Sequence, residues 1–523
     1  MTEQTNVTGA NVTGGGVTYT QVGQEYFEKR GLRRHAGVWS LWALGVGAVI
    51  SGQFSGWNLG FALGGFGGLF WAAIIIAVMY FGLVFCLAEM SPALPHTGGA
   101  YSFARSAMGP WGGFVTGLAE NIEYVLTPAV VIFFAGSYLT NIFHTPAAAQ
   151  PIWWLAGYVV FIGLNIMGVE TSFRVTVIIT VLALAVLAIF WVSALPHFDY
   201  SRWALNIGAG PDGKPVELPD GKGPFLPFGW GGVLACLPFA VWLFLAIEEL
   251  PLASEETHDP KRDMPRGIIA GMVTLFVSAI LILFLNAGVG SAQPDKMHGA
   301  FSLGTSAEPI LDGFRVTIGG NIATILALFA VIGLIASFHT IIFAYGRQIY
   351  SLSRAGYLPQ FLSVTHSSRR TPDTALIFGG VLGFVVMTVV YYAFGADQAT
   401  STIGGVLLNM AVFGAMISYA LQGLSFLLLR VRFPNIPRPY RSPLGSAGAV
   451  VTIVIALVTL WVQLQDPVYQ KGVFGVAAWY VIGVLYFAVF GRHKLVLSPE
   501  EEFAMTHGVH GHPESEGYGK TRL

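Results

Sequence analysis

At residues 239–256 the chain reads FAVWLFLAIEELPLASEE, an apolar run that leads into two adjacent carboxylates, Glu248 and Glu249, and then Pro251. A charged group at the centre of a membrane helix costs at least about 2.5–3.5 kcal/mol. Non-helical backbone at that depth is tolerated where it lines a cavity or is buried in protein. We therefore expect a helix break here, with the acid facing a polar cavity and not lipid.

The composition predicts an integral membrane protein. The chain has 523 residues, of which 54% are hydrophobic and 11% charged, and its mean hydropathy is +0.64. Soluble proteins carry about 25% charged residues. A membrane helix needs about 20 apolar residues, and hydropathy predicts an all-α protein with twelve such spans. They lie near 38–62, 66–91, 111–140, 151–168, 172–195, 231–252, 266–289, 319–350, 373–394, 401–430, 446–463 and 473–490.

The basic residues predict the orientation. With the N-terminus inside, 21 of the 27 Lys and Arg residues fall on the cytoplasmic side. This bias is typical of a protein with both termini in the cytoplasm, and we expect multi-pass insertion in the plasma membrane, the inner membrane of a bacterium. The long polar arm before the first span argues against a cleavable signal peptide. The glycine- and proline-rich stretch 91–110 is too apolar for an ordinary loop and predicts a short re-entrant or interfacial piece.

The first span is rich in glycine and reads LGVGAVISGQFSGWNLG at 44–60. One interpretation is a stripe of small residues for close helix packing. The other is a helix broken around Ser51, Gly52 and Gln53. Spans one and six are five spans apart, and paired interrupted helices in matching halves indicate the midplane site of an inverted-repeat transporter.

These patterns divide the chain into six regions. They are a cytoplasmic arm (1–37), a first five-helix repeat (38–195), an external loop (196–230), a second five-helix repeat (231–430), a cytoplasmic loop with spans eleven and twelve (431–490) and a cytoplasmic tail (491–523).

The predicted spans contain five acids, Glu89, Glu120, Glu123, Glu248 and Glu249, and we expect no strong base within the bilayer to pair with them, with Arg105 at a boundary. Intramembrane acids normally pair with a base or mark a substrate or ion path, so a cation is expected to enter from outside. Glu89 and Glu249 have the alternative of hydration near the cytoplasmic ends.

Glu120 and Glu123 lie three residues apart on one helix, where two ionised carboxylates repel each other. One of them is expected to be neutral, to bind an external cation or to face water. Tyr124 lies beside them. A purely structural hydrogen-bonded cluster with Asn121 is the alternative.

Several other classes of function are excluded or disfavoured. No basic face indicates nucleic-acid binding. Cys86 and Cys236 fall within apolar spans and predict packing residues. We find no H-E-x-x-H, G-x-S-x-G or G-x-x-x-x-G-K-[ST] motif, which argues against an enzyme and against ATP as the driver. No cofactor or metal is expected, because the tail histidines at 507, 510 and 512 have no acid or cysteine to complete a ligand set.

Three blocks resemble the amino acid–polyamine–organocation (APC) superfamily of permeases. They are FLAIEELPLASEETHDPKRDMPRGI (244–268), GRQIYSLSRAGYLPQFL (346–362) and FPNIPRPYRSP (433–443). A closer likeness is to its ethanolamine permease branch, carried by WALGVGAVISGQFSGWNLG (42–60), AEMSPALPHTGGAYSFAR (88–105) and GPWGGFVTGLAENIEYVLTPAV (109–130). The resemblance implies the LeuT-like fold, with two inverted five-helix repeats, discontinuous helices one and six, and two further helices.

The resemblance also implies roles for individual residues. Trp242, with Phe244, matches a position where a ring contacts a cationic substrate, and an indole face attracts an ammonium by about 0.5–2 kcal/mol. Packing is the alternative for Trp242. Glu248 matches a glutamate of the unwound helix that serves coupling or gating.

The chain departs from the amino acid carriers of that family at two places. The first break reads Ile50-Ser51-Gly52-Gln53-Phe54, one glycine short of the usual carboxylate pocket or shifted by one residue, and Ala246 stands where glycine is usual. A weakened carboxylate pocket beside surplus acids suits an amine without a carboxylate. Ethanolamine fits, with its ammonium near Glu123, Glu120 and Tyr124 and its hydroxyl near Ser51, Gly52 and Gln53.

We therefore expect a secondary carrier that imports ethanolamine by alternating access, driven by protons, with the substrate, protons and membrane lipid as its partners. A carrier of choline, a polyamine or an amino acid is the alternative within the class. A membrane amine sensor that does not transport is the alternative outside it.

Overall fold

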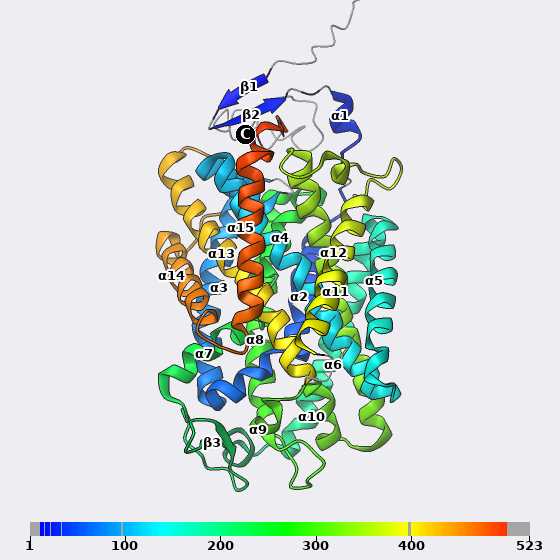
Figure 1. The fold of residues 1–523 in the computed structure, drawn as a ribbon, viewed down its shortest axis with the longest axis vertical. Coiled ribbons are helices and arrows are strands. Elements are labelled where there is room, and N and C mark those ends of the chain that lie inside the picture. The colour runs from blue at the N-terminus through cyan, green and yellow to red at the C-terminus, as the bar shows by residue number, and fades with distance from the viewer. Residues whose placement is uncertain are drawn as a thin grey trace, which may run out of the picture.

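The computed structural model describes residues 11–498 and residue 501, except 15, 21, 23, 33, 96–97 and 396–398. The tail histidines His507, His510 and His512 lie outside these residues. The described helices form an upright bundle (Figure 1). They are α1 (Gln24–Glu28), α2 (Val38–Phe54), α3 (Phe61–Ala93), α4 (Gly99–Phe143), α5 (Gln150–Ile166), α6 (Val169–Ala194), α7 (Gly229–Val241), α8 (Pro260–Ala287), α9 (Gly299–Leu303), α10 (Pro309–Thr317), α11 (Gly320–Arg354), α12 (Asp373–Phe394), α13 (Thr400–Arg432), α14 (Gly445–Gln463) and α15 (Gln470–Val489).

Ten of the described helical segments are long and apolar enough to cross a membrane. Two more apolar helices, α2 with 17 residues and α7 with 13, are shorter. At 1.5 Å per residue neither covers the roughly 30 Å of hydrocarbon. Each continues past a break into a second piece, the 3₁₀ helices η1 (Trp57–Gly60) and η5 (Ile247–Glu256). These two interrupted helices are spans one and six of the sequence prediction.

Glycines at positive φ divide two long helices where the sequence predicted boundaries. Gly65 has φ 64° inside α3, so the part of α3 before it completes the first predicted span and the part after it is the second. Gly109 has φ 81° inside α4 and separates a short helical piece, 99–108, from the long helix that follows. That piece falls in the stretch 91–110 for which the sequence predicted an interfacial segment.

The two ends of the bundle carry different structures (Figure 1). At one end, which we call the terminal end, β1 (Asn11–Gly14), β2 (Val17–Thr20) and β5 (Leu495–Val496) form a small sheet; β1 and β2 are antiparallel, and β2 and β5 are parallel. At the other, the loop end, lie the hairpin β3 (Ile207–Ala209) and β4 (Pro215–Glu217) and the helices α9 and α10.

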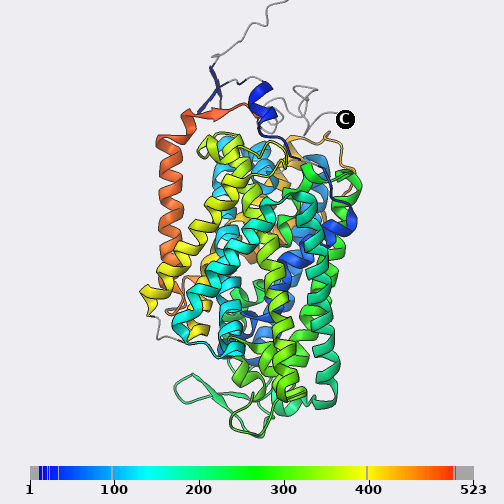
Figure 2. The ribbon, with the colours of Figure 1, turned by 90° about the vertical axis from the view of Figure 1, so that its right-hand side faces the viewer.

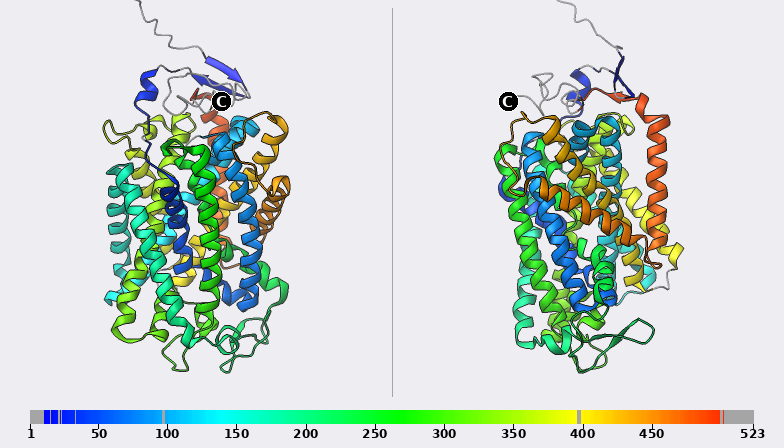
Figure 3. Two further views of the ribbon diagram at one scale, coloured as in Figure 1. Left: turned by 180° about the vertical axis from the view of Figure 1, so that it is seen from behind. Right: turned by 90° about the vertical axis from the view of Figure 1, so that its left-hand side faces the viewer.

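The helices of the bundle differ in burial: an inner set is buried, and the outer helices expose apolar side chains. The central α4 packs against α11 and α13. Helix α15 stands at the edge of the bundle (Figure 2), and its Ile482 and Leu485 are each more than half exposed. An apolar exterior of this kind is stable against acyl chains and not against water. From behind, α2 and α8 run side by side (Figure 3).

Candidate functional site

The two helix breaks lie where the chain leaves the α-helical region of backbone space. Helix α2 ends at Phe54, and Gly56 follows with φ 95°. Helix α7 ends at Val241, and Ala246 then has φ 83°. A positive φ is uncommon for alanine, and strained backbone of this kind clusters at functional sites. The break in span six is where the sequence predicted it.

The break in span one lies farther along the chain than predicted. Ser51, Gly52 and Gln53 belong to the last turn of α2, and the Ser55 backbone N–H donates to the Ser51 carbonyl to close that turn. The helix stops at Ser55 and Gly56 because Gly56 is the residue that takes the positive φ. The predicted break around Ser51–Gln53 is therefore corrected to Ser55–Gly56.

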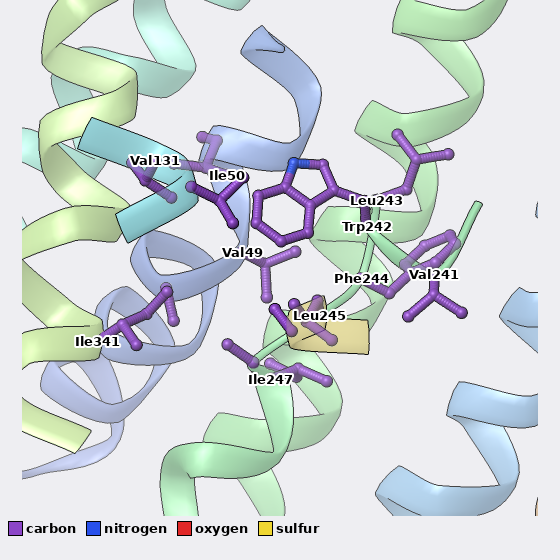
Figure 4. Close-up of a cluster of buried hydrophobic side chains, with 14 of the residues drawn as sticks. Val49, Ile50, Val131, Val241, Trp242, Leu243, Phe244, Leu245, Ile247 and Ile341 are labelled. Atoms are coloured by element: carbon purple, nitrogen blue, oxygen red, sulfur yellow. The ribbon is translucent and has the colours of Figure 1, made fainter. Parts of the chain in front are cut away.

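The two breaks are in direct contact. The Trp242 indole N–H donates to the Ser55 carbonyl at 3.0 Å, and the Tyr138 hydroxyl donates to the Phe54 carbonyl at 2.8 Å. Figure 4 shows the Trp242 ring directed toward Val49 and Ile50 of α2. Side chains of α4 and of span six thus occupy carbonyls that the end of α2 leaves without helical partners.

The contact leaves no room for a side chain on Gly52. A Cβ added there would lie 2.0 Å from the Trp242 carbonyl oxygen. We expect Gly52→Ala to destabilise the fold by about 1–3 kcal/mol, the range for overpacking in a packed interior, and to lower transport. Thermal unfolding of the purified protein measures the first effect. Gly163→Ala on α5 is the matched control, because a Cβ there meets nothing within 4 Å; equal stability of both variants would contradict the close approach.

Four carboxyl groups meet beside the break of span six. Glu120 and Glu123 extend from α4, Glu248 and Glu249 from η5, and each is at most 2% exposed. Glu120, Glu123 and Glu248 lie close enough together for their charges to interact. Ionised carboxylates that are close together repel each other, so this arrangement favours bound protons or a cation.

Tyrosine and amide groups supply part of the hydrogen bonding. The Tyr419 hydroxyl donates to Glu123 Oε1 at 2.9 Å, and Tyr80 donates to Tyr419 at 3.2 Å. Glu120 accepts from Gln348 at 2.8 Å and from Tyr124 at 3.3 Å. Among the described residues, Glu123 Oε2 and both oxygens of Glu248 and of Glu249 have no hydrogen-bond partner. Buried charges without partners are costly, so this cluster, which we call the carboxyl cluster, suits an incoming cation.

Aromatic rings border the carboxyl cluster. The Tyr80 ring lies 5.5 Å from the Phe244 ring and 5.5 Å from the Tyr419 ring, centre to centre. Phe244 thus packs against Tyr80, whose hydroxyl bonds to the tyrosine that reaches Glu123. Tyr80, Tyr419 and Gln348 were missed by the sequence reasoning. The two tyrosines did carry a signal, because both lie inside predicted spans. Tyrosines of membrane helices normally lie at the membrane interface.

The Gln53 amide is engaged by the neighbouring helix α8. It donates to the Ser278 hydroxyl at 2.6 Å and to the Leu275 carbonyl at 3.3 Å, both on α8. Trp242 is likewise engaged through its N–H by the break of span one. Ser51 and Gly52 stay in the last turn of α2, and Gly52 faces span six.

Two predictions about the remaining acids are wrong. Glu89 has resident bases, because it pairs with Arg430 at 2.6 Å and with Arg438 at 3.1 Å. Glu249 is 1% exposed and so is not hydrated at the protein surface. Among the described residues, the other four glutamates have no ion-pair partner, whereas Glu89 has two.

Two ion pairs lie between the carboxyl cluster and the terminal end. Arg347 of α11 pairs with Glu256 at 2.9 Å, and Arg354 pairs with Glu255 at 2.7 Å. Both pairs are buried and join α11 to η5, the second half of span six. They therefore fasten the discontinuous helix, through η5, to the continuous helix α11.

Comparison with known proteins gives relatives along nearly the whole chain. A branched-chain amino acid permease of Bacillus subtilis is 24% identical, covering 89% of this chain and 95% of that protein. A methylthioribose transporter of the same organism is 23% identical, covering 90% and 96%. An uncharacterized transporter of Rhizobium meliloti is 26% identical, covering 89% and 93%. The amino acid permease model matches residues 37–489, and the chain therefore belongs to the amino acid permease family of multi-pass membrane transporters.

Proposed function

We propose that this transporter imports ethanolamine across the plasma membrane, driven by protons. The observation that carries this is the carboxyl cluster: four buried glutamates, no ion-pair partner for them among the described residues, and rings of Tyr80, Tyr419 and Phe244 beside them. A small ammonium neutralises such a site and stacks on its rings.

The assignment of roles follows the geometry. Glu123, with Glu120 and Tyr124, is the counter-charge of the ammonium, and Phe244 and Trp242 supply the aromatic contact. Ser51 and Gly52, in the last turn of α2, are the proposed partners of the hydroxyl; Gln53 joins them only if its amide leaves Ser278. Glu248, a buried member of the carboxyl cluster, holds the coupling proton.

The proposed mechanism is alternating access in a LeuT-like arrangement of twelve spans. The interrupted helices α2/η1 and α7/η5 are helices one and six of two inverted five-helix repeats, and α14 and α15 follow the repeats. One repeat rocks about the fixed site. The terminal end is cytoplasmic, in agreement with the excess of Lys and Arg there.

Amino acid substrates are the first alternative, because one relative is named a branched-chain amino acid permease. An amino acid brings a carboxylate, which four glutamates would repel, so an amine without one is favoured. Choline and polyamines share the ammonium and differ in size. Among the described residues nothing favours an enzyme.

Labelled uptake into proteoliposomes tests the substrate. We expect ethanolamine uptake that excess ethanolamine abolishes and excess choline, putrescine, leucine or methylthioribose leaves largely intact. An inward proton gradient should accelerate uptake, and replacing Na⁺ with K⁺ should not change it. Counterflow in sealed vesicles separates a carrier from a sensor, which binds without flux. Uptake of leucine and not ethanolamine would refute the assignment.

A further inference from the structure

A segment at the loop end rests on the break of span one. This segment, 299–317, comprises α9, α10 and the chain between them, and we call it the lid. The Asn58 side-chain amide donates to the lid carbonyls of Leu303 at 2.6 Å and Ser306 at 2.8 Å. The Ser55 hydroxyl donates to the Ala307 carbonyl at 2.7 Å. The residues that interrupt span one are therefore also the residues that bind the lid.

Helix α4 joins the same contact through one phenol. The Tyr138 hydroxyl donates to the Phe54 carbonyl and accepts from the Ile310 backbone N–H of the lid at 3.2 Å. If the lid departs, Tyr138 loses one of these bonds and the end of α2 loses its cover. Lid position and helix-break geometry are thus coupled through hydrogen bonds and not only through packing.

Glu308 lies at the centre of the lid contact. The Ser137 hydroxyl of α4 donates to its carboxyl group. The charged and titratable groups that face it are Asp312 and Arg315 of α10 and Tyr138 of α4. Arg315 is already engaged by Asp312 at 3.2 Å and by Asn141 at 2.7 Å. The break of span one contributes uncharged side chains to the lid contact: Ser55, between α2 and η1, and Asn58, in η1.

The environment of Glu308 favours its protonated form while the lid is seated. Burial raises the pKa of Glu308 from 4.5 to about 7, and the negative charge of Asp312 adds to this, against the opposing effects of Ser137 and Arg315. A carboxyl group with an ordinary pKa in the open lid and a raised pKa in the closed lid binds its proton more tightly when closed. The stabilisation of the closed lid is therefore complete below pH 4.5 and is lost as the pH rises through about 7. The closed-to-open ratio changes by up to about 300-fold over that window.

We propose that the lid is a proton-responsive outer gate, in which protonation of Glu308 seats 299–317 on the break of span one; its role in uptake rests on the proposed proton-driven import with the loop end outside. The proton on Glu308 then closes the lid over the site, and it is a different proton from the one held by Glu248. Deprotonation of Glu308 weakens the seating of the lid, and departure of the lid exposes the break of span one. External pH therefore sets how long the site stays open to the outside.

Cysteine labelling in nanodiscs tests the gate without any substrate and with both membrane faces accessible. Ala307→Cys places a thiol under the lid, where the native side chain is 8% exposed, and Thr305→Cys places one on the exposed lid surface. The native Cys86 and Cys236 are fully buried. The maleimide labelling rate at 307 divided by the rate at 305 corrects for the pH dependence of thiol reactivity.

We expect this ratio to rise about tenfold or more between pH 5.5 and 8.5 and to stay low and flat in Glu308→Gln, which mimics the protonated form. Glu217→Gln, at the loop end but bonded to His298 and not to Glu308, should keep the native profile. A flat native ratio, or a pH-dependent ratio in Glu308→Gln, overturns the gate. Failure of ethanolamine uptake leaves this result unaffected, so the two proposals fail separately.

Discussion

Replacing Glu123 with glutamine is expected to weaken ethanolamine binding by about tenfold to 150-fold. A hydrogen bond to a charged group contributes about 1.5–3 kcal/mol, and glutamine keeps the shape of the side chain while removing the charge. The Tyr419 hydroxyl, which donates to Glu123 Oε1 at 2.9 Å, can donate equally to the amide oxygen. The variant is therefore expected to fold, and a binding isotherm at neutral pH measures the loss.

Glu170→Gln is the matched control, because Glu170 pairs with Arg174 on the surface and both are more than half exposed. It should leave the dissociation constant unchanged. If Glu123→Gln binds ethanolamine as tightly as the native protein, Glu123 is not the counter-charge of the ammonium. If it weakens choline binding equally and ethanolamine is the poorer ligand, the site is a general amine site and the ethanolamine assignment is wrong.

The sequence predicted the parts of the fold that hydropathy and backbone chemistry determine locally. Apolar length gave helices close to the expected ranges, and Gly65 and Gly109 ended segments because glycine adopts a positive φ freely. The break of span six was predicted from Glu248, Glu249 and Pro251. The break of span one was placed a few residues early, because several glycines of that span could end a helix and only the tertiary contacts select Gly56.

The candidate site was predicted less completely, because its pairings join distant parts of the chain. Tyr419 reaches Glu123 across 296 residues, and Arg430 reaches Glu89 across 341. No local pattern reports such contacts. Gln53 shows the opposite failure: a polar residue near a break looked available for substrate, and the neighbouring helix α8 uses its amide instead.

Arg347→Met is expected to destabilise the protein by about 3–5 kcal/mol. Arg347 and Glu256 are both fully buried, with Arg347 Nη2 2.9 Å from Glu256 Oε1 and Nε 3.3 Å from Oε2. Removing one partner of a buried pair leaves an uncompensated charge, which is the costly outcome. The guanidinium also lies 3.8 Å above the Phe343 ring, so a cation–π contact is lost as well. Thermal unfolding in detergent, compared with the native protein, measures the loss.

The double variant Arg347→Met/Glu256→Leu distinguishes the pair from the packing around it. Replacing both members of a buried pair with apolar residues is often neutral or stabilising, so we expect it to recover most of the lost stability. Because the pair fastens η5 to α11, the single variant should also increase maleimide labelling of a cysteine at Ser254, which is 1% exposed. An unchanged unfolding temperature for Arg347→Met, or a double variant no more stable than the single one, would show that this ion pair does not stabilise the packing of η5 against α11.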